Sequence, residues 1–237
     1  MGSKPRFGFV NPTPHPDPKH WEPYSDTGLR YRTRLYNLTG LQELTEETME
    51  VYRILRNLMA EKHKTKMAIT KEEFESYADM LMHRLIHIVQ YKVSEFPNQN
   101  ALIFGLFGHA ALAHVTTFIG NPARRGSVLE LMSTRIRASL EVIDVQSFQV
   151  AYPEMMLWII MVGGLASTGT ENQGWFAEFF SESCLAAGIN RITELALFLS
   201  EFLWNDNYLG PLCKEFWDDF AAAHTRKLRI REVLVID

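Results

Sequence analysis

The stretch NALIFGLFGHAALAHVTTFI, from Asn100 to Ile119, decides the fold. If it forms a helix, apolar side chains occupy nearly the whole circumference of that helix. In a globular protein, a helix of this kind is surrounded by other elements. We therefore predict that residues 100–119 form a central, buried helix.

The sequence on both sides of this stretch has helical periodicity and capping signals. Thr45 is predicted as the N-cap of a helix that ends near Lys66, and a capping box from Thr70 to Glu73 opens a helix that ends near Val93. Pro153 suits the first turn of a helix that carries the apolar run ending at Ala166. Further helices are predicted at about 127–143, 173–187, 192–204 and 212–226.

The alternating tail, residues 228–236, predicts a short strand or an extended docking arm. No run of strands is visible elsewhere, which argues against a parallel sheet or a barrel. The predicted fold is all-α, a single multi-helix globular domain.

Proline marks the start of the chain, because six of the ten prolines lie within the first 23 residues. Proline removes amide donors and favours extended polyproline conformations. We assign residues 1–40 to an extended, Pro-rich arm or linker and residues 41–237 to the helical domain.

Composition narrows the class of protein. Of the 237 residues, 46% are hydrophobic and 22% are charged, as in ordinary globular proteins. A net charge of -4 and a pI near 6.1 argue against direct nucleic-acid binding, which usually needs a basic surplus. The apolar run from Met155 to Ala166 is too short to span a bilayer.

The two cysteines, Cys184 and Cys213, are too few for a disulfide framework and indicate a reducing compartment, the nucleus or the cytoplasm. The start of the chain lacks the apolar segment of a signal peptide. No metal or cofactor motif occurs. Asp79, His83 and His87 share one helix face opposite Leu81 and Leu85, where an exposed acid–histidine group is expected.

His109 and His114 interrupt the apolar stretch, where an unpaired imidazole would be costly. At 3.6 residues per turn the two side chains point roughly 140° apart, so they cannot easily share one ligand. Each is either a hydrogen-bonded core histidine or part of an internal cavity. Glu154 suits the dipole at the start of its helix. If the chain is an enzyme, His109, His114 and Glu154 are the candidate acid/base groups.

Aromatic and Met residues are concentrated in residues 155–180, where they form either ordinary core or an adaptable pocket for an apolar ligand. The pairs Gly105/Gly108 and Gly163/Gly164 follow no phosphate-binding pattern and are expected to let helices approach closely. The pocket candidates are Phe104, Phe107, His109, His114, Met155, Trp158, Trp175 and Phe176.

Several stretches in the second half have the order and spacing of a known domain. They are 101–117, 129–140, PEMMLWIIMVGGLA at 153–166, GWF at 174–176, FLWN at 202–205 and FWDD at 216–219. Together they resemble the fungal-specific transcription factor domain, the helical region that follows the zinc-cluster DNA-binding module. The resemblance spans roughly residues 101–220, and its strongest part is 153–176.

The resemblance implies a regulatory domain that mediates self-association, repression or activation and, in some members, effector binding. This sequence lacks the six-cysteine cluster, so it is expected to be either an excised regulatory portion or a standalone relative that never binds DNA.

Three functions remain open at this point. The first is an effector-sensing domain, possible as a homodimer, with an interior cavity between residues 100–119 and 153–187 for an apolar or aromatic small molecule. The second is a standalone enzyme of fungal secondary metabolism that uses the same pocket for acid/base or conformational control of a reactive intermediate. The third is an interaction module without a ligand.

Overall fold

The computed structural model describes residues 22–38, 40–62, 64, 69–92, 99–119 and 126–235. The Pro-rich residues 1–21, for which we predicted an extended arm, lie outside this set.

The described residues are helical and contain no strand, which confirms the predicted all-α class. The helices are α1 (Asp26–Tyr36), α2 (Gln42–Lys62), α3 (Lys71–His87), α4 (Gln99–His114), α5 (Gly126–Leu140), α6 (Val145–Ala151), α7 (Pro153–Ala166), α8 (Gln173–Ala186), α9 (Ile192–Ser200) and α10 (Lys214–Val235). The π-helical turns η1 (Ile88–Lys92) and η3 (Val115–Ile119) continue α3 and α4, and the 3-10 turns η5 (Asp206–Leu209) and η6 (Pro211–Cys213) precede α10.

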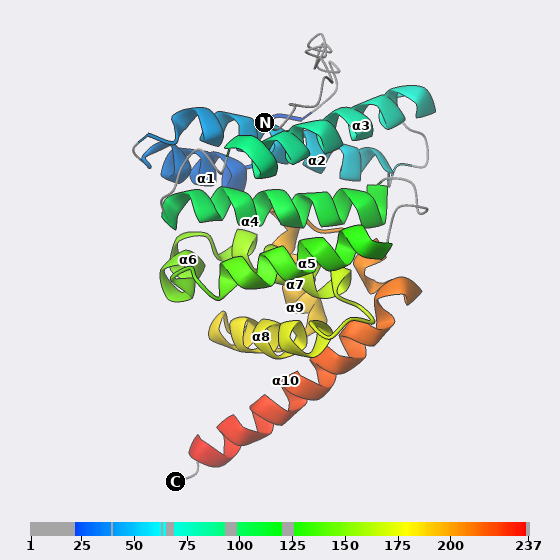
Figure 1. Ribbon diagram of the computed structural model, residues 1–237. Helices are drawn as coiled ribbons and strands as arrows, with labels where there is room; N and C mark the ends of the chain where they lie inside the picture. The colour runs from blue at the N-terminus through cyan, green and yellow to red at the C-terminus, as the bar shows by residue number, and fades with distance from the viewer. Residues whose placement is uncertain are drawn as a thin grey trace, which may run out of the picture.

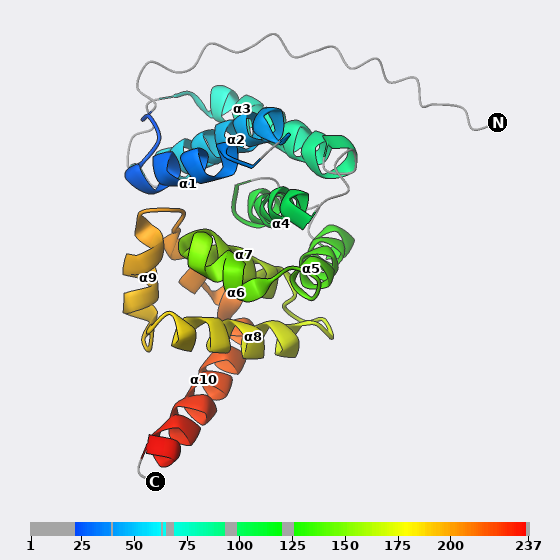
Figure 2. The ribbon, with the colours of Figure 1, turned by 90° about the vertical axis from the view of Figure 1, so that its left-hand side faces the viewer.

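The helices are stacked in layers (Figure 1). α1, α2 and α3 lie at one end, α4 lies beneath them, and α5, α6 and α7 follow (Figure 2). α8 comes next, and α10 packs against it before its C-terminal half extends away from the other helices (Figures 1 and 2).

The central position of α4 is confirmed. It packs against α2, α3, α5 and α7, and side chains such as Phe104 and Leu106 are fully buried. Residues Asn100–Ile119 are long and apolar enough to cross a membrane, but 78% of their most apolar window is buried within the fold. Among the described residues, this stretch therefore has the burial of a core helix.

Local signals place several helix starts correctly. At the start of α3, Thr70 Oγ1 accepts a hydrogen bond from the Glu73 amide at 3.1 Å, and Glu73 Oε2 accepts one from the Thr70 amide at 2.7 Å. Pro153 is the first residue of α7. Both predictions are confirmed.

Gly108, Gly163 and Gly164 allow close helix packing, as predicted. A Cβ on Gly164 would lie 2.2 Å from Cε2 of Phe216, and one on Gly163 would lie 2.6 Å from Cε1 of Phe176. A Cβ on Gly108 would lie 2.5 Å from Cγ1 of Val89. At these positions any side chain would displace a neighbouring group.

Four predictions about the ends of elements are wrong. The helix predicted at about 192–204 ends at Ser200. The predicted arm, residues 1–40, contains α1, whose N-cap Ser25 accepts a hydrogen bond from the Gly28 amide through its hydroxyl. Thr45 lies inside α2, where its hydroxyl donates to the Leu41 carbonyl. The tail is helical to Val235, because Leu, Arg and Glu are good helix formers and α10 is already nucleated before them.

Candidate functional site

Six side chains form a buried group around Trp158, which we call the Trp158 cluster. The members come from α4, η3, α7, the segment after α9, and η5; they are Phe107, His114, Phe118, Trp158, Phe202 and Tyr208. Neighbouring ring centroids lie 4.9 to 6.0 Å apart. The cluster therefore fills the space between α4 and α7 with aromatic side chains.

A hydrogen-bonded chain runs through this cluster. Trp158 Nε1 donates to the Tyr208 hydroxyl at 3.0 Å, and that hydroxyl lies 2.9 Å from His114 Nδ1. Since the indole can only donate, the Tyr208 hydroxyl proton is free to point at His114 Nδ1. The imidazole proton is then on Nε2, which is buried and has no hydrogen-bond partner among the described residues.

The surroundings keep His114 neutral. Burial, and to a smaller extent the charge of Lys62, lower the pKa of His114 to about 3. The Lys62 ammonium donates to the Phe118 carbonyl, so its charge stays beside the cluster. Burial also raises the pKa of Tyr208. This arrangement holds a neutral imidazole and a neutral phenol in contact.

His109 lies in different surroundings. Burial lowers its pKa, with the Gly105 backbone acting in the opposite direction and Arg135 of α5 lowering it further. His114 is influenced instead by Lys62 of α2. The two imidazoles are thus influenced by charges on different helices, α5 and α2.

Glu154 joins α7 to α1. Tyr31 donates its hydroxyl proton to the Glu154 carboxylate and accepts the Glu154 amide at 3.1 Å. Arg30 Nη2 lies 3.1 Å from Glu154 Oε1. Burial, followed by the bond to Glu154, raises the pKa of Tyr31. Glu154 thus contacts α1 rather than either histidine.

The other pocket candidates are distributed over the core. Phe104 and Met155 are buried in α4 and α7, and Phe176 packs against Gly163. Trp175 stacks on Phe179 with a centroid distance of 4.9 Å, and the Arg137 guanidinium lies 5.2 Å from its ring. Trp175 therefore lies beside α5 rather than in the Trp158 cluster.

The polar face of α3 is exposed to solvent as predicted, with Asp79, His83 and His87 outside the core. Within the part of the chain that the structure describes, no three His, Cys, Asp or Glu side chains could hold a metal ion. Cys184 and Cys213 are both buried and are not joined in a disulfide, and burial raises the pKa of the Cys184 thiol to about 12.

A groove of about 650 Å³ lies between α10, the start of α9, and η5 and η6; we call it the α10 groove. Most of its lining is apolar: Ile192, Leu209, Gly210, Pro211, Trp217, Phe220, Ala221 and Leu228. Its polar members are Asn190, Lys214, His224 and Thr225. The cation among them, Lys214, forms an ion pair with Asp218. The groove therefore suits an apolar or aromatic ligand.

Two contacts fix the aromatic wall of this groove. Trp217 Nε1 donates to the Tyr208 carbonyl at 2.6 Å. His224 stacks on Phe220 with a centroid distance of 5.1 Å, and its Nδ1 lies 3.2 Å from the Ser181 hydroxyl. Through Tyr208, the wall of the groove is bonded directly to the Trp158 cluster.

This groove was not predicted from the sequence, although one of its walls follows a helical pattern. Trp217, Ala221, His224 and Leu228 recur at helical spacing and form one stripe along α10. The facing wall comes from Ile192 and residues 209–211. The periodicity of α10 cannot predict that these residues pack opposite it.

No known protein family, curated protein or solved structure matches the chain.

Proposed function

We propose that this chain is a regulatory, effector-sensing helical domain that binds an apolar or aromatic small molecule in the α10 groove. The observation that carries the proposal is the groove itself. Its volume of about 650 Å³ lies within the range of small-molecule sites, and an apolar lining with a few polar groups is typical of them.

We assign the ligand to this groove rather than to the space between α4 and α7. That interior space was the cavity expected from the sequence, but the rings of Phe107, Trp158 and His114 occupy it in contact with one another. Close-packed interiors leave little room for a ligand.

The regulatory part of the proposal rests on the path from the groove to the core. A ligand that contacts Leu209 touches η5 directly, and one that contacts Trp217 touches a side chain hydrogen-bonded to the Tyr208 carbonyl of η5. The Tyr208 hydroxyl is in turn bonded to Trp158 and lies beside His114. Such a ligand changes the conformational equilibrium if it binds one arrangement of η5 more tightly than another. The stretch that most resembles the fungal-specific transcription factor domain, residues 153–176, includes Trp158 and supports the same assignment.

The enzymatic alternative gains no support from the geometry of its candidate groups. His109, His114 and Glu154 have separate surroundings, whereas acid/base chemistry on one substrate needs groups within hydrogen-bond reach of it. Self-association, the absence of direct nucleic-acid binding, and location in the nucleus or cytoplasm remain predictions.

Binding of 2-naphthol, a neutral bicyclic aromatic compound, tests the proposal. Ala221 is exposed and lines the groove, so Ala221→Leu places a larger side chain in the site without removing a core contact. Steric conflict between the larger side chain and a bound ligand should cost about 1–3 kcal/mol, which corresponds to roughly 5- to 150-fold weaker binding. Ala222→Leu is the matched control, because Ala222 is an exposed neighbour on α10 that does not line the groove.

Isothermal titration calorimetry should give saturable binding to the unchanged chain and to Ala222→Leu, and greatly weakened binding to Ala221→Leu. Absence of saturable binding, or equal weakening by both substitutions, would contradict the proposed site.

A further inference from the structure

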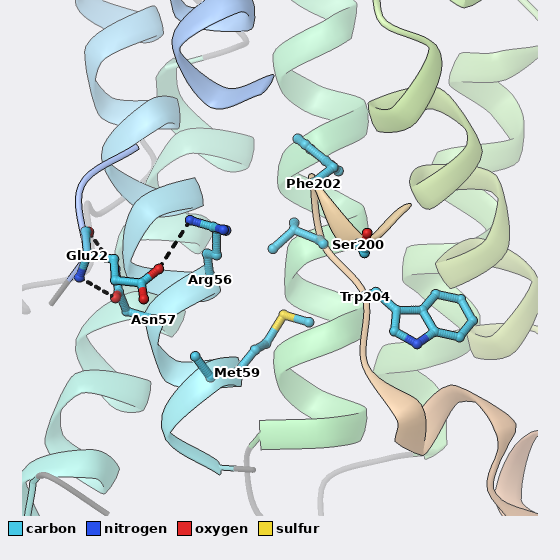
Figure 3. A pocket seen from close by; sticks show the side chains of 9 residues that line it. Glu22, Arg56, Asn57, Met59, Ser200, Phe202 and Trp204 are labelled. Carbon is cyan, nitrogen blue, oxygen red and sulfur yellow. Dashed lines mark hydrogen bonds and ion pairs between the residues drawn. The ribbon is translucent and has the colours of Figure 1, made fainter. Parts of the chain in front are cut away.

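A second cavity, of about 190 Å³, lies between α2 and the segment that follows α9 (Figure 3). We call it the Arg56 cavity. It is separate from the α10 groove, since the two share no lining residue. Its lining consists of Glu22, Arg56, Asn57, Met59, Ala60, Ser200, Phe202, Leu203 and Trp204.

One wall of this cavity is polar and is held in place by Asn57. The Asn57 side chain, which is buried, accepts the Glu22 amide at 2.9 Å and donates to the Glu22 carbonyl at 3.2 Å. Three residues later, the Ser25 hydroxyl donates to the Glu201 carbonyl at 3.2 Å. The main chain at Glu22 is therefore fixed beside the cavity, while its carboxylate remains 72% exposed.

Arg56 on the same wall is poorly paired. The ion pair that it makes within the described part of the chain joins its Nη1 to Glu22 Oε2 at 3.7 Å, which is beyond hydrogen-bond distance. A guanidinium carries five N–H donors and matches a carboxylate best in a two-pronged contact. Exposed ion pairs of this loose kind contribute little to stability, so Glu22 is easily displaced.

The opposite wall is apolar. Phe202 and Leu203 on this wall are buried, and the Trp204 indole is held by a hydrogen bond of 2.9 Å from its Nε1 to Asp206. Met59, also buried, adds an apolar side chain from α2, the helix of Arg56. Figure 3 shows Phe202 and Trp204 across the cavity from Arg56. The cavity volume of 190 Å³ exceeds the roughly 150 Å³ that accommodates benzene in an engineered protein cavity.

We propose that the Arg56 cavity binds a small carboxylate with an apolar or aromatic body. The carboxylate takes the place of the Glu22 side chain on Arg56, and the body packs against Met59, Phe202 and Leu203. Glu22 thereby acts as an internal competitor that lowers the affinity for the ligand.

Calorimetric titration with benzoate tests this site, with benzamide as the neutral compound of the same shape. We expect saturable binding of benzoate and much weaker binding of benzamide. Arg56→Gln should weaken benzoate binding about 10- to 100-fold, as expected for the loss of charge-assisted hydrogen bonds. Glu22→Gln should strengthen it about two- to fivefold, because the competing carboxylate is gone.

The matched controls come from the ion pair between Arg32 and Glu46, whose atoms lie 2.8 Å apart and which does not line the cavity. Arg32→Gln and Glu46→Gln make the same changes of net charge and should leave benzoate binding unchanged. Circular dichroism establishes that each variant is folded. If Arg56→Gln does not fold, the effect of Glu22→Gln on benzoate affinity still tests the site, because Glu22 is exposed.

Three results would overturn the inference: no saturable benzoate binding, equal binding of benzamide, or no gain of affinity in Glu22→Gln. None of these depends on 2-naphthol binding in the α10 groove, so the two proposals can fail separately.

Discussion

Tyr208 is the hydrogen-bond partner of two buried side chains of the Trp158 cluster, Trp158 and His114. Its hydroxyl accepts the Trp158 indole proton and lies 2.9 Å from His114 Nδ1. Buried polar groups are tolerated when they are hydrogen-bonded and are costly when they are not. The sequence indicated that His114 needs a partner, but it could not identify one that lies 94 residues away along the chain.

Tyr208→Phe should therefore destabilise the fold. The substitution keeps the ring but leaves Trp158 Nε1 and His114 Nδ1 without this partner, at a cost of about 2–4 kcal/mol in the free energy of unfolding. Urea denaturation measures the change. Tyr36→Phe is the control, because it removes the same oxygen from a half-exposed tyrosine and should have almost no effect. If both variants lost the same free energy of unfolding, the hydrogen bonds of Tyr208 to Trp158 and His114 would not be the source of the stability.

His114 should also make stability depend on pH. An unfolded chain protonates histidine near pH 6.5, whereas burial holds the pKa of His114 at about 3 in the fold. Between these values the unfolded state binds more protons, so the free energy of unfolding falls as the pH falls, by up to about 1.4 kcal/mol per pH unit.

Nitrogen NMR of the His114 imidazole measures the protonation of this ring separately from that of other titrating groups. At about pH 5 the His114 ring should still give the shifts of the neutral form, because its folded pKa lies near 3. Protonation of the ring above about pH 6 would contradict the buried arrangement.

At the scale of elements, most helices with strong local signals were predicted, but α1 and α6 were missed although each begins after a side-chain N-cap, Ser25 and Asp144. The Thr70 capping box, Pro153 and the apolar run of α4 each determine structure through nearby residues. α1 was assigned to the arm because proline content dominates that part of the sequence. Its signals are the Ser25 cap and the apolar pair Tyr31 and Leu35. That pair stabilises α1 only because the helix packs on α2 and the two side chains are buried.

Gly164 should be intolerant of a side chain because α7 and α10 meet there. A methyl group on Gly164 would lie 2.2 Å from the ring of Phe216, which is fully buried and cannot move aside cheaply. Gly164→Ala should lower the free energy of unfolding by about 1–3 kcal/mol, despite the higher helix propensity of alanine.

Gly174→Ala is the control for that experiment. Gly174 lies in α8, and a Cβ there would meet nothing within 4 Å. This substitution should be neutral or stabilising by up to about 1 kcal/mol in thermal or urea unfolding. Equal destabilisation by both substitutions would mean that helix contact at Gly164 is not the cause.

At the scale of the whole molecule, the central apolar stretch together with periodicity and capping along the chain predicted the fold class, but not the binding surface. Because α4 is apolar around nearly its whole circumference, it must be buried, and amphipathic helices pack around it. The α10 groove instead combines α10 with Ile192 and residues 209–211. A surface built from separated segments depends on tertiary packing. The periodicity of one helix predicts which of its own residues share a face, but not which other segment packs beside that face.

The Arg56 cavity illustrates the same limit. Arg56 and Asn57 are adjacent in α2, but the opposite wall comes from residues 200–204. Nothing in the spacing of these segments brings them together. The predicted pocket residues are largely buried aromatic side chains, because an aromatic-rich stretch of sequence predicts core. Both cavities lie instead where separate elements meet.

The position of a bound aromatic molecule is the most direct test of the proposed effector site. Crystals of the chain grown with 2-naphthol should show the compound in the α10 groove, in contact with Trp217 and Phe220. The compound bound between α4 and α7, or absent from the groove at saturating concentration, would contradict the assignment.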